Sequence, residues 1–133
     1  MDKNYEISWR NPQMTVLMVT YHADVGWDDI IGANVEALDR IKVLPQEIIL
    51  FHNAGPYKVK QFGFGVAHDL LYNRLPRPPK NLKFIVTLMS DPAQQKSFYG
   101  AAELLDKLFF RRKYAYVVGS LVEAERLIAQ AGF

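Results

Sequence analysis

Two kinds of apolar pattern alternate along the chain. Short, mostly apolar runs at Ile48–Phe51, Phe84–Met89 and Tyr116–Val118 are typical of parallel strands that are buried on both faces of a sheet. Between them, apolar residues recur every three or four positions, as expected for helices that bury one face. The alternation predicts an α/β domain with a mostly parallel sheet. We predict strands over residues 47–53, 83–90 and 114–118, and helices over residues 27–41, 64–75, 94–110 and 120–131.

The N-terminal part has a different pattern, because two strand-like segments follow one another without a helix between them. Tyr5–Arg10 and Met14–His22 are separated by the turn-forming residues Asn11, Pro12 and Gln13. We therefore predict an N-terminal antiparallel hairpin ahead of the parallel part of the sheet.

The last predicted helix has clear start and stop signals. Ser120 and Glu123 have the spacing of a capping box, in which each side chain bonds the other residue's backbone amide. Gly132 follows the last apolar position and can end the helix. The final twenty residues therefore predict a complete strand-helix unit.

Composition limits the class of protein. The chain has 133 residues, half of them apolar, which is enough for one domain over residues 1–133 with its own core. It has no cysteine, which excludes disulfides, thiolate metal sites and cysteine catalysis and fits a reducing cytoplasm. The N-terminus lacks the pattern of a signal peptide, and no apolar run approaches the roughly 18 residues of a membrane span. We expect a cytoplasmic protein with no membrane span.

Charge is unevenly distributed along the chain. Residues 1–50 contain four Lys and Arg against eight Asp and Glu, whereas residues 51–133 contain twelve against six. Two interpretations stay open: solvated loops and helix ends, or a surface for an acidic or phosphate-bearing partner. Nucleic acid is not an expected partner, because the net charge is only +2 and no helix carries a one-sided basic stripe.

Three segments resemble the SpoIIAA-like branch of the STAS family, the anti-sigma-factor antagonists. They are Val16–Ile31, Glu47–Phe51 and the closing Val118–Ala124, which contains a Ser-Leu-Val-Glu-Ala motif. The resemblance implies a strand-helix superhelix, with a mostly parallel sheet and an N-terminal hairpin. It also implies a noncatalytic module that binds a protein partner or a small ligand.

One property of that family does not carry over to this chain. Regulatory members are phosphorylated on a Ser or Thr after the central strand, where the added charge disrupts partner binding. This chain has no Ser or Thr between Tyr21 and Val86. We therefore expect a binding module without the family's phosphorylation switch.

The loop after the strand at 47–53 is the candidate binding segment. Ligands of open α/β sheets bind outside the carboxyl ends of the parallel strands. This loop is rich in glycine, aromatic residues and lysine, but its Gly-Phe-Gly motif fits neither a dinucleotide fingerprint nor a P-loop. It either covers the edge of the core or recognises a protein partner or a small amphipathic ligand. The candidate contact residues are His52, Asn53, Tyr57, Lys58, Lys60, Phe62 and Phe64.

A metal-dependent enzyme is the alternative function. If the strands lie in sequential order, His22 and His52 come from neighbouring strand ends and could approach each other or Asp24. A structural or surface role for the histidines is the competing interpretation, since no histidine shows the spacing of a known metal motif. We assign no catalytic residue, no metal ligand and no cofactor from the sequence.

A homodimer is the last expectation. On the helix predicted over residues 94–110, the apolar stripe cannot bury Tyr99 and Phe110 as well. If these two lie near Tyr114 or Phe133, they would form an apolar patch of the kind found at interfaces. The alternative is that the C-terminal strand-helix unit folds over them.

Overall fold

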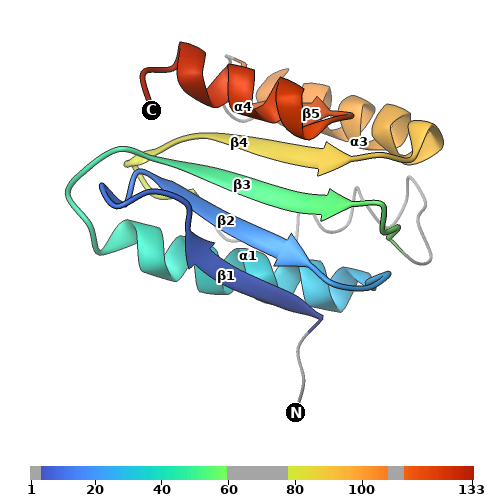
Figure 1. Cartoon of the computed structure of the whole chain (residues 1–133), viewed down its shortest axis with the longest axis horizontal. Helices are drawn as coiled ribbons and strands as arrows, with labels where there is room; N and C mark the ends of the chain where they lie inside the picture. The colour runs from blue at the N-terminus through green and yellow to red at the C-terminus, as the bar shows by residue number, and fades with distance from the viewer. Residues whose placement is uncertain (1–3, 60–77, 108–112) are drawn as a thin grey trace.

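A five-stranded sheet forms the centre of the molecule (Figure 1). The computed structural model describes residues 4–59, 78–107 and 113–133. In these parts the strand order is β1-β2-β3-β4-β5, which follows the order along the chain. The strands are β1 (Tyr5–Trp9), β2 (Val16–Tyr21), β3 (Ile48–Gly55), β4 (Leu82–Met89) and β5 (Ala115–Val118).

The pairing confirms the predicted sheet. β1 runs antiparallel to β2, and each later strand runs parallel to the one before it. The Asn11 side chain organises the hairpin turn by accepting the amides of Thr15 and Val16 at 3.0 and 3.1 Å. Met14 completes the turn with φ of 57°, a left-handed conformation.

Three helices are described: α1 (Trp27–Lys42), α3 (Pro92–Leu105) and α4 (Leu121–Gln130). All three were predicted from the apolar spacing. The helix predicted over residues 64–75 lies outside the described residues. None of the described helices is long and apolar enough to cross a membrane.

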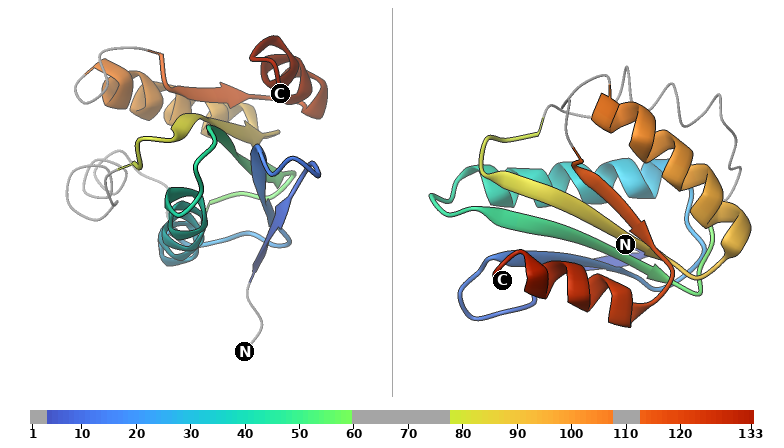
Figure 2. Two further views of the ribbon diagram at one scale, coloured as in Figure 1. Left: turned by 90° about the vertical axis from the view of Figure 1, so that its left-hand side faces the viewer. Right: turned by 90° about the horizontal axis from the view of Figure 1, so that it is seen from above.

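The sheet has an apolar core on each face, as the continuous apolar runs predict. One core joins Leu17 and Leu50 to α1 and to Phe98 of α3. The other joins Phe51 and Val86 to α4. Figure 2 shows α1 and α4 on opposite sides of the sheet. We call these the α1 face and the α4 face.

One polar residue closes the connection between α1 and β3. The side-chain amide of Asn81, just before β4, donates to the carbonyl oxygens of three residues in this connection, at 2.7 to 3.1 Å: Ile41, Leu44 and Gln46. The Ile41 carbonyl also accepts the Leu44 amide, whereas the Leu44 and Gln46 carbonyls have no backbone donor within the described residues. Asn81 therefore joins the end of α1 to the strands, a role that the sequence analysis did not identify.

Arg10 links the hairpin to α4. Its guanidinium lies over the Phe51 ring, 5.8 Å from the ring centroid, and forms an ion pair with Glu125 of α4. It also donates to the Met18 sulfur at 3.7 Å. Arg10 therefore covers part of the α4 face that the helix leaves open.

Of the two hydrogen bonds in the capping box predicted for α4, the one accepted by the Ser120 side chain is present. The Glu123 amide donates to Ser120 Oγ at 3.2 Å. The opposite half of a capping box occurs at α1, where the N-cap amide of Gly26 donates to the Asp29 carboxylate at 3.3 Å. The spacing of Ser120 and Glu123 predicts the first of these contacts, whereas the second was not predicted.

Replacing Ser120 with Ala should lower the free energy of unfolding by about 1 kcal/mol, because it removes the acceptor for the Glu123 amide. Urea denaturation of the two proteins measures this difference. A Ser8→Ala variant is the control, because Ser8 lies in β1 and caps no helix. Equal losses in both variants would contradict the role of the cap.

The residues predicted to form an apolar patch around Tyr99 differ in how far they are exposed. Tyr99 is 49% exposed, as expected, but Tyr114 is only 2% exposed and belongs to the core of the α1 face. Phe133 packs against the core of the α4 face. The suggestion that Tyr114 extends an exposed patch is therefore wrong, because that ring points into the core. Phe110 lies outside the described residues, and the homodimer stays a prediction.

Candidate functional site

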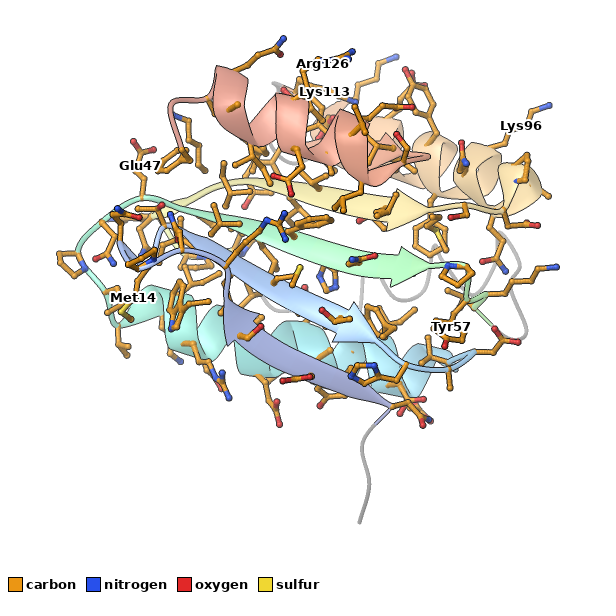
Figure 3. The ribbon with its side chains drawn as sticks, viewed as in Figure 1. Met14, Glu47, Tyr57, Lys96, Lys113 and Arg126 are labelled. Atoms are coloured by element: carbon orange, nitrogen blue, oxygen red, sulfur yellow. The ribbon has the colours of Figure 1, made fainter. Side chains whose placement is uncertain are left out.

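The segment after β3 lies at the carboxyl edge of the sheet, where β2, β3 and β4 all end (Figure 3). The chain turns at Gly55, whose φ of +55° is readily adopted by glycine. The Tyr57 amide then donates to the Ala54 carbonyl at 3.0 Å. Pro56, Tyr57 and Lys58 are thereby placed across the end of the sheet.

This segment is attached on one side to the loop between β2 and α1. The Lys58 amide donates to Asp24 Oδ1 at 2.8 Å, and the Val25 amide donates to the Lys58 carbonyl at 3.0 Å. The same region forms a parallel bridge between Val25 and Val59. Asp24 therefore has a positioning role at this edge.

On the other side, Gln94 of α3 binds the same segment. Its Oε1 accepts the Val59 amide and its Nε2 donates to the Val59 carbonyl, both at 3.0 Å. The Gln94 amide in turn donates to Asp91, the N-cap of α3. The backbone of residues 58 and 59 thus has hydrogen bonds on two sides.

The segment presents one aromatic ring and one cation. Tyr57 is half-buried and Lys58 is exposed. The Lys58 ammonium lies 3.7 Å from Asp91 Oδ1, so an acidic group stands beside the basic one. This combination suits a ligand or partner with both apolar and polar groups. Lys60, Phe62 and Phe64, the remaining candidate residues, lie outside the described residues.

Neighbouring candidates His52 and Asn53 point to opposite faces of the sheet, as successive residues of a strand do. His52 is buried on the α1 face, while Asn53 is half-buried. His52 therefore does not share an exposed surface with Tyr57 and Lys58. His52 was chosen as a candidate because of its position at the end of a predicted strand. Its burial sets it apart from Tyr57 and Lys58.

His52 belongs instead to a buried polar network. Its Nδ1 lies 3.0 Å from the Tyr21 hydroxyl and its Nε2 lies 3.3 Å from Asn34 Oδ1. Burial lowers the pKa of His52 to about 4, so the ring is neutral near pH 7. Burial, together with the nearby Tyr5 and Asp29, raises the pKa of Tyr21 above its ordinary value, so its hydroxyl keeps its proton. The consistent arrangement has Tyr21 donating to Nδ1 and Nε2–H donating to Asn34.

The residues of the alternative metal site have separate partners. His22 Nε2 lies 3.5 Å from Glu6 at the exposed end of the hairpin. Asp24 accepts the Lys58 amide, and His52 is bonded to Tyr21 and Asn34. In the part of the chain that the structure describes, no group of three or more His, Asp or Glu side chains could hold a metal ion.

Comparison of the chain with protein-family models, curated proteins and solved structures gave no match.

Two residues of the site were missed by the sequence analysis. Asp91 precedes Pro92, and an Asp followed by Pro is a helix-start signal that could have placed the beginning of α3. Gln94 had no such signal, because a buried glutamine that binds a backbone 35 residues away leaves no local pattern.

A Gln94→Glu variant should lose about 2 kcal/mol of unfolding free energy, because the carboxylate cannot donate to the Val59 carbonyl. The backbone amides of Lys58 and Val59 should also exchange with solvent faster. Hydrogen exchange and urea denaturation measure the two effects.

The matched control for this prediction is Gln95→Glu. The Gln95 side chain makes an exposed bond to the Ser90 carbonyl at 3.3 Å. This variant should change stability by less than about 0.5 kcal/mol. Unchanged exchange at Val59 in Gln94→Glu would show that Gln94 does not hold the segment.

Proposed function

We propose that the chain is a noncatalytic STAS-like binding or regulatory module that uses the segment after β3 to recognise a protein partner or a small amphipathic ligand. The observation that carries the proposal is the two-sided attachment of this segment by Asp24 and Gln94. A backbone held in this way loses little freedom on binding, which favours recognition by the side chains that it presents. The contact residues within the described chain are Asn53, Tyr57 and Lys58.

The order of elements supports the SpoIIAA-like part of the proposal. A hairpin is followed by parallel strands that alternate with helices, and the capped α4 closes the chain. The absence of Ser and Thr between Tyr21 and Val86 means that regulation by a Ser/Thr kinase at the family position is chemically excluded. Recognition would then depend on the ligand or partner itself.

The test for a protein partner compares two lysines. Lys58 and Lys42 have side chains that are 60% and 59% exposed, and each has an aspartate within 4 Å. Lys42 ends α1 and lies near the start of β3, the opposite end of the sheet from Lys58 (Figure 1). In quantitative affinity purification from cells that express the chain naturally, a partner of the site should be retained by Lys42→Glu and lost with Lys58→Glu. Equal retention would contradict the proposed surface.

The test for a small ligand uses an amphipathic dye, 1-anilinonaphthalene-8-sulfonate. Its aromatic rings and sulfonate match the ring of Tyr57 and the ammonium of Lys58. In NMR titrations the amide signals of residues 53–59 should shift, and Tyr57→Ala should weaken the binding. Glu47→Ala, at the opposite end of the sheet (Figure 3), is the control and should leave the binding unchanged. If the dye shifts only the amide signals of residues outside 53–59, the segment does not bind amphipathic ligands.

A further inference from the structure

A second group of side chains surrounds a cation between α3 and β5. The ammonium of Lys113 lies 5.2 Å from the centroid of the Tyr99 ring and 5.0 Å from that of the Tyr116 ring. Both distances are within the range of a cation–π interaction. Figure 3 shows Lys113 on the upper side of the molecule, away from Tyr57. The two sites are therefore separate.

Asp106 supplies a negative charge to the same place. This residue is only 8% exposed, and its Oδ1 accepts the amides of Tyr114 and Ala115 at 3.0 and 2.9 Å. Its Oδ2 accepts no hydrogen bond in the described part of the chain, and it lies 3.8 Å from the Lys113 ammonium. A buried carboxylate oxygen without a hydrogen bond is costly unless a cation lies beside it.

Tyr99, Tyr116 and Asp106 form a cage in which the ammonium lies too far from the carboxylate for a direct hydrogen bond. A charge-assisted hydrogen bond from an ammonium to a carboxylate is about 2.7 to 2.9 Å long, about 1 Å shorter than the distance observed. A methyl group on nitrogen adds a bond of about 1.5 Å. Its contact with a ring adds about 3.5 Å, so a methylated nitrogen lies about 5 Å from the ring. The Lys113 ammonium lies at this distance from both rings, so a trimethylated nitrogen at its position would bring methyl groups into contact with them.

Two walls of the cage, Tyr116 and Asp106, are held in place by contacts other than that with Lys113. The Tyr116 ring packs edge-on against Phe84, with ring centroids 5.1 Å apart. Asp106 is fixed by its two bonds to the backbone at the start of β5. Lys113 itself has a side chain that is 41% exposed, so its ammonium can leave the cage for water.

We propose that Tyr99, Tyr116 and Asp106 form a binding site for a trimethylammonium group, which Lys113 occupies when no ligand is bound. Rings and a carboxylate are the groups that recognise quaternary ammonium ions, since such ions cannot donate hydrogen bonds. Lys113 therefore acts as an internal competitor for the site. The ligand is either a small quaternary ammonium compound or a trimethylated lysine of another protein.

The test compares choline with 3,3-dimethylbutan-1-ol, which has the same shape and no charge. Titration calorimetry should show choline binding at least tenfold more tightly to Lys113→Met than to the wild type, because the competitor is removed. The neutral alcohol should not bind measurably to either protein. Equal binding of choline and the alcohol, or equal affinity of the two proteins for choline, would overturn the proposal.

Substitutions of cage residues in the Lys113→Met protein distinguish binding in the cage from nonspecific binding of choline. Tyr116→Leu should abolish choline binding, whereas Tyr99→Phe, which keeps the ring, should retain it. Comparing a trimethyllysine peptide with choline shows whether the site prefers a trimethylated lysine or a small quaternary ammonium compound. Binding of either one supports recognition of a trimethylammonium group. Retention of choline by Tyr116→Leu would refute the cage.

The wild-type protein provides a test that does not depend on the folding of a variant. Protons above aromatic rings resonate upfield, so the Hε signals of Lys113 should move downfield when choline displaces the ammonium. Addition of the neutral alcohol is the control and should leave these signals in place. Unchanged Hε signals at saturating choline would refute displacement.

Discussion

Acidification from pH 6.5 to pH 4 should destabilise the wild-type protein by about 3 kcal/mol more than a His52→Gln variant. The pKa of His52 in the folded protein is about 4, against 6.5 for a histidine in the unfolded chain. Between these values the unfolded chain binds a proton that the folded protein does not. The contribution of His52 to stability is therefore complete above pH 6.5 and is lost as the pH falls towards 4.

The measurement is urea denaturation of both proteins at several pH values between 7 and 4. His52→Gln should be less stable at pH 7, because it disturbs the contacts with Tyr21 and Asn34, but its stability should fall less on acidification. His22→Gln is the control, since His22 is exposed and paired with Glu6 outside the network. In this variant the contacts of His52 with Tyr21 and Asn34 remain, so the extra loss of stability assigned to His52 should remain. Parallel curves for wild type and His52→Gln would show that His52 is not buried in a neutral state.

Replacing Asn81 with Ala should lower the free energy of unfolding by about 2 to 3 kcal/mol. The change removes the donor that the Leu44 and Gln46 carbonyls have within the described residues and one of the donors to the Ile41 carbonyl, and unpaired acceptors that are shielded from water are costly. Asn81→Asp keeps the shape of the side chain but removes its donors, so it should be at least as damaging. Urea denaturation at pH 7 measures both variants.

Asn53→Ala is the matched control for this prediction. Asn53 is also half-buried and lies at the opposite end of β3, but its side chain makes no hydrogen bond within the described residues. Its replacement should change stability by less than about 0.5 kcal/mol. A similar loss in the Asn53 and Asn81 variants would indicate a general effect of burial rather than the loss of these bonds.

The candidate site was predicted in part. The rule that ligands bind at the carboxyl ends of parallel strands led to the segment that contains Tyr57 and Lys58. The same rule included His52, because spacing along a strand does not reveal how deeply a side chain is buried. The cage around Lys113 was not predicted, since its members come from α3, its C-terminal end and β5. Only packing of these elements brings their side chains together.

The sequence by itself determined the local elements and their pattern of burial. Apolar runs such as Ile48–Phe51 can be stable only with both faces covered, and Ser120 marks the start of a helix through a contact three residues away. Tertiary structure decided the contacts of Gln94, Asn81 and Asp106. These side chains bind backbone groups that lie between 8 and 40 residues away, so their partners depend on how the elements pack. Local periodicity carries no information about such pairs, because it reports which face of an element is buried and not which polar group lies opposite.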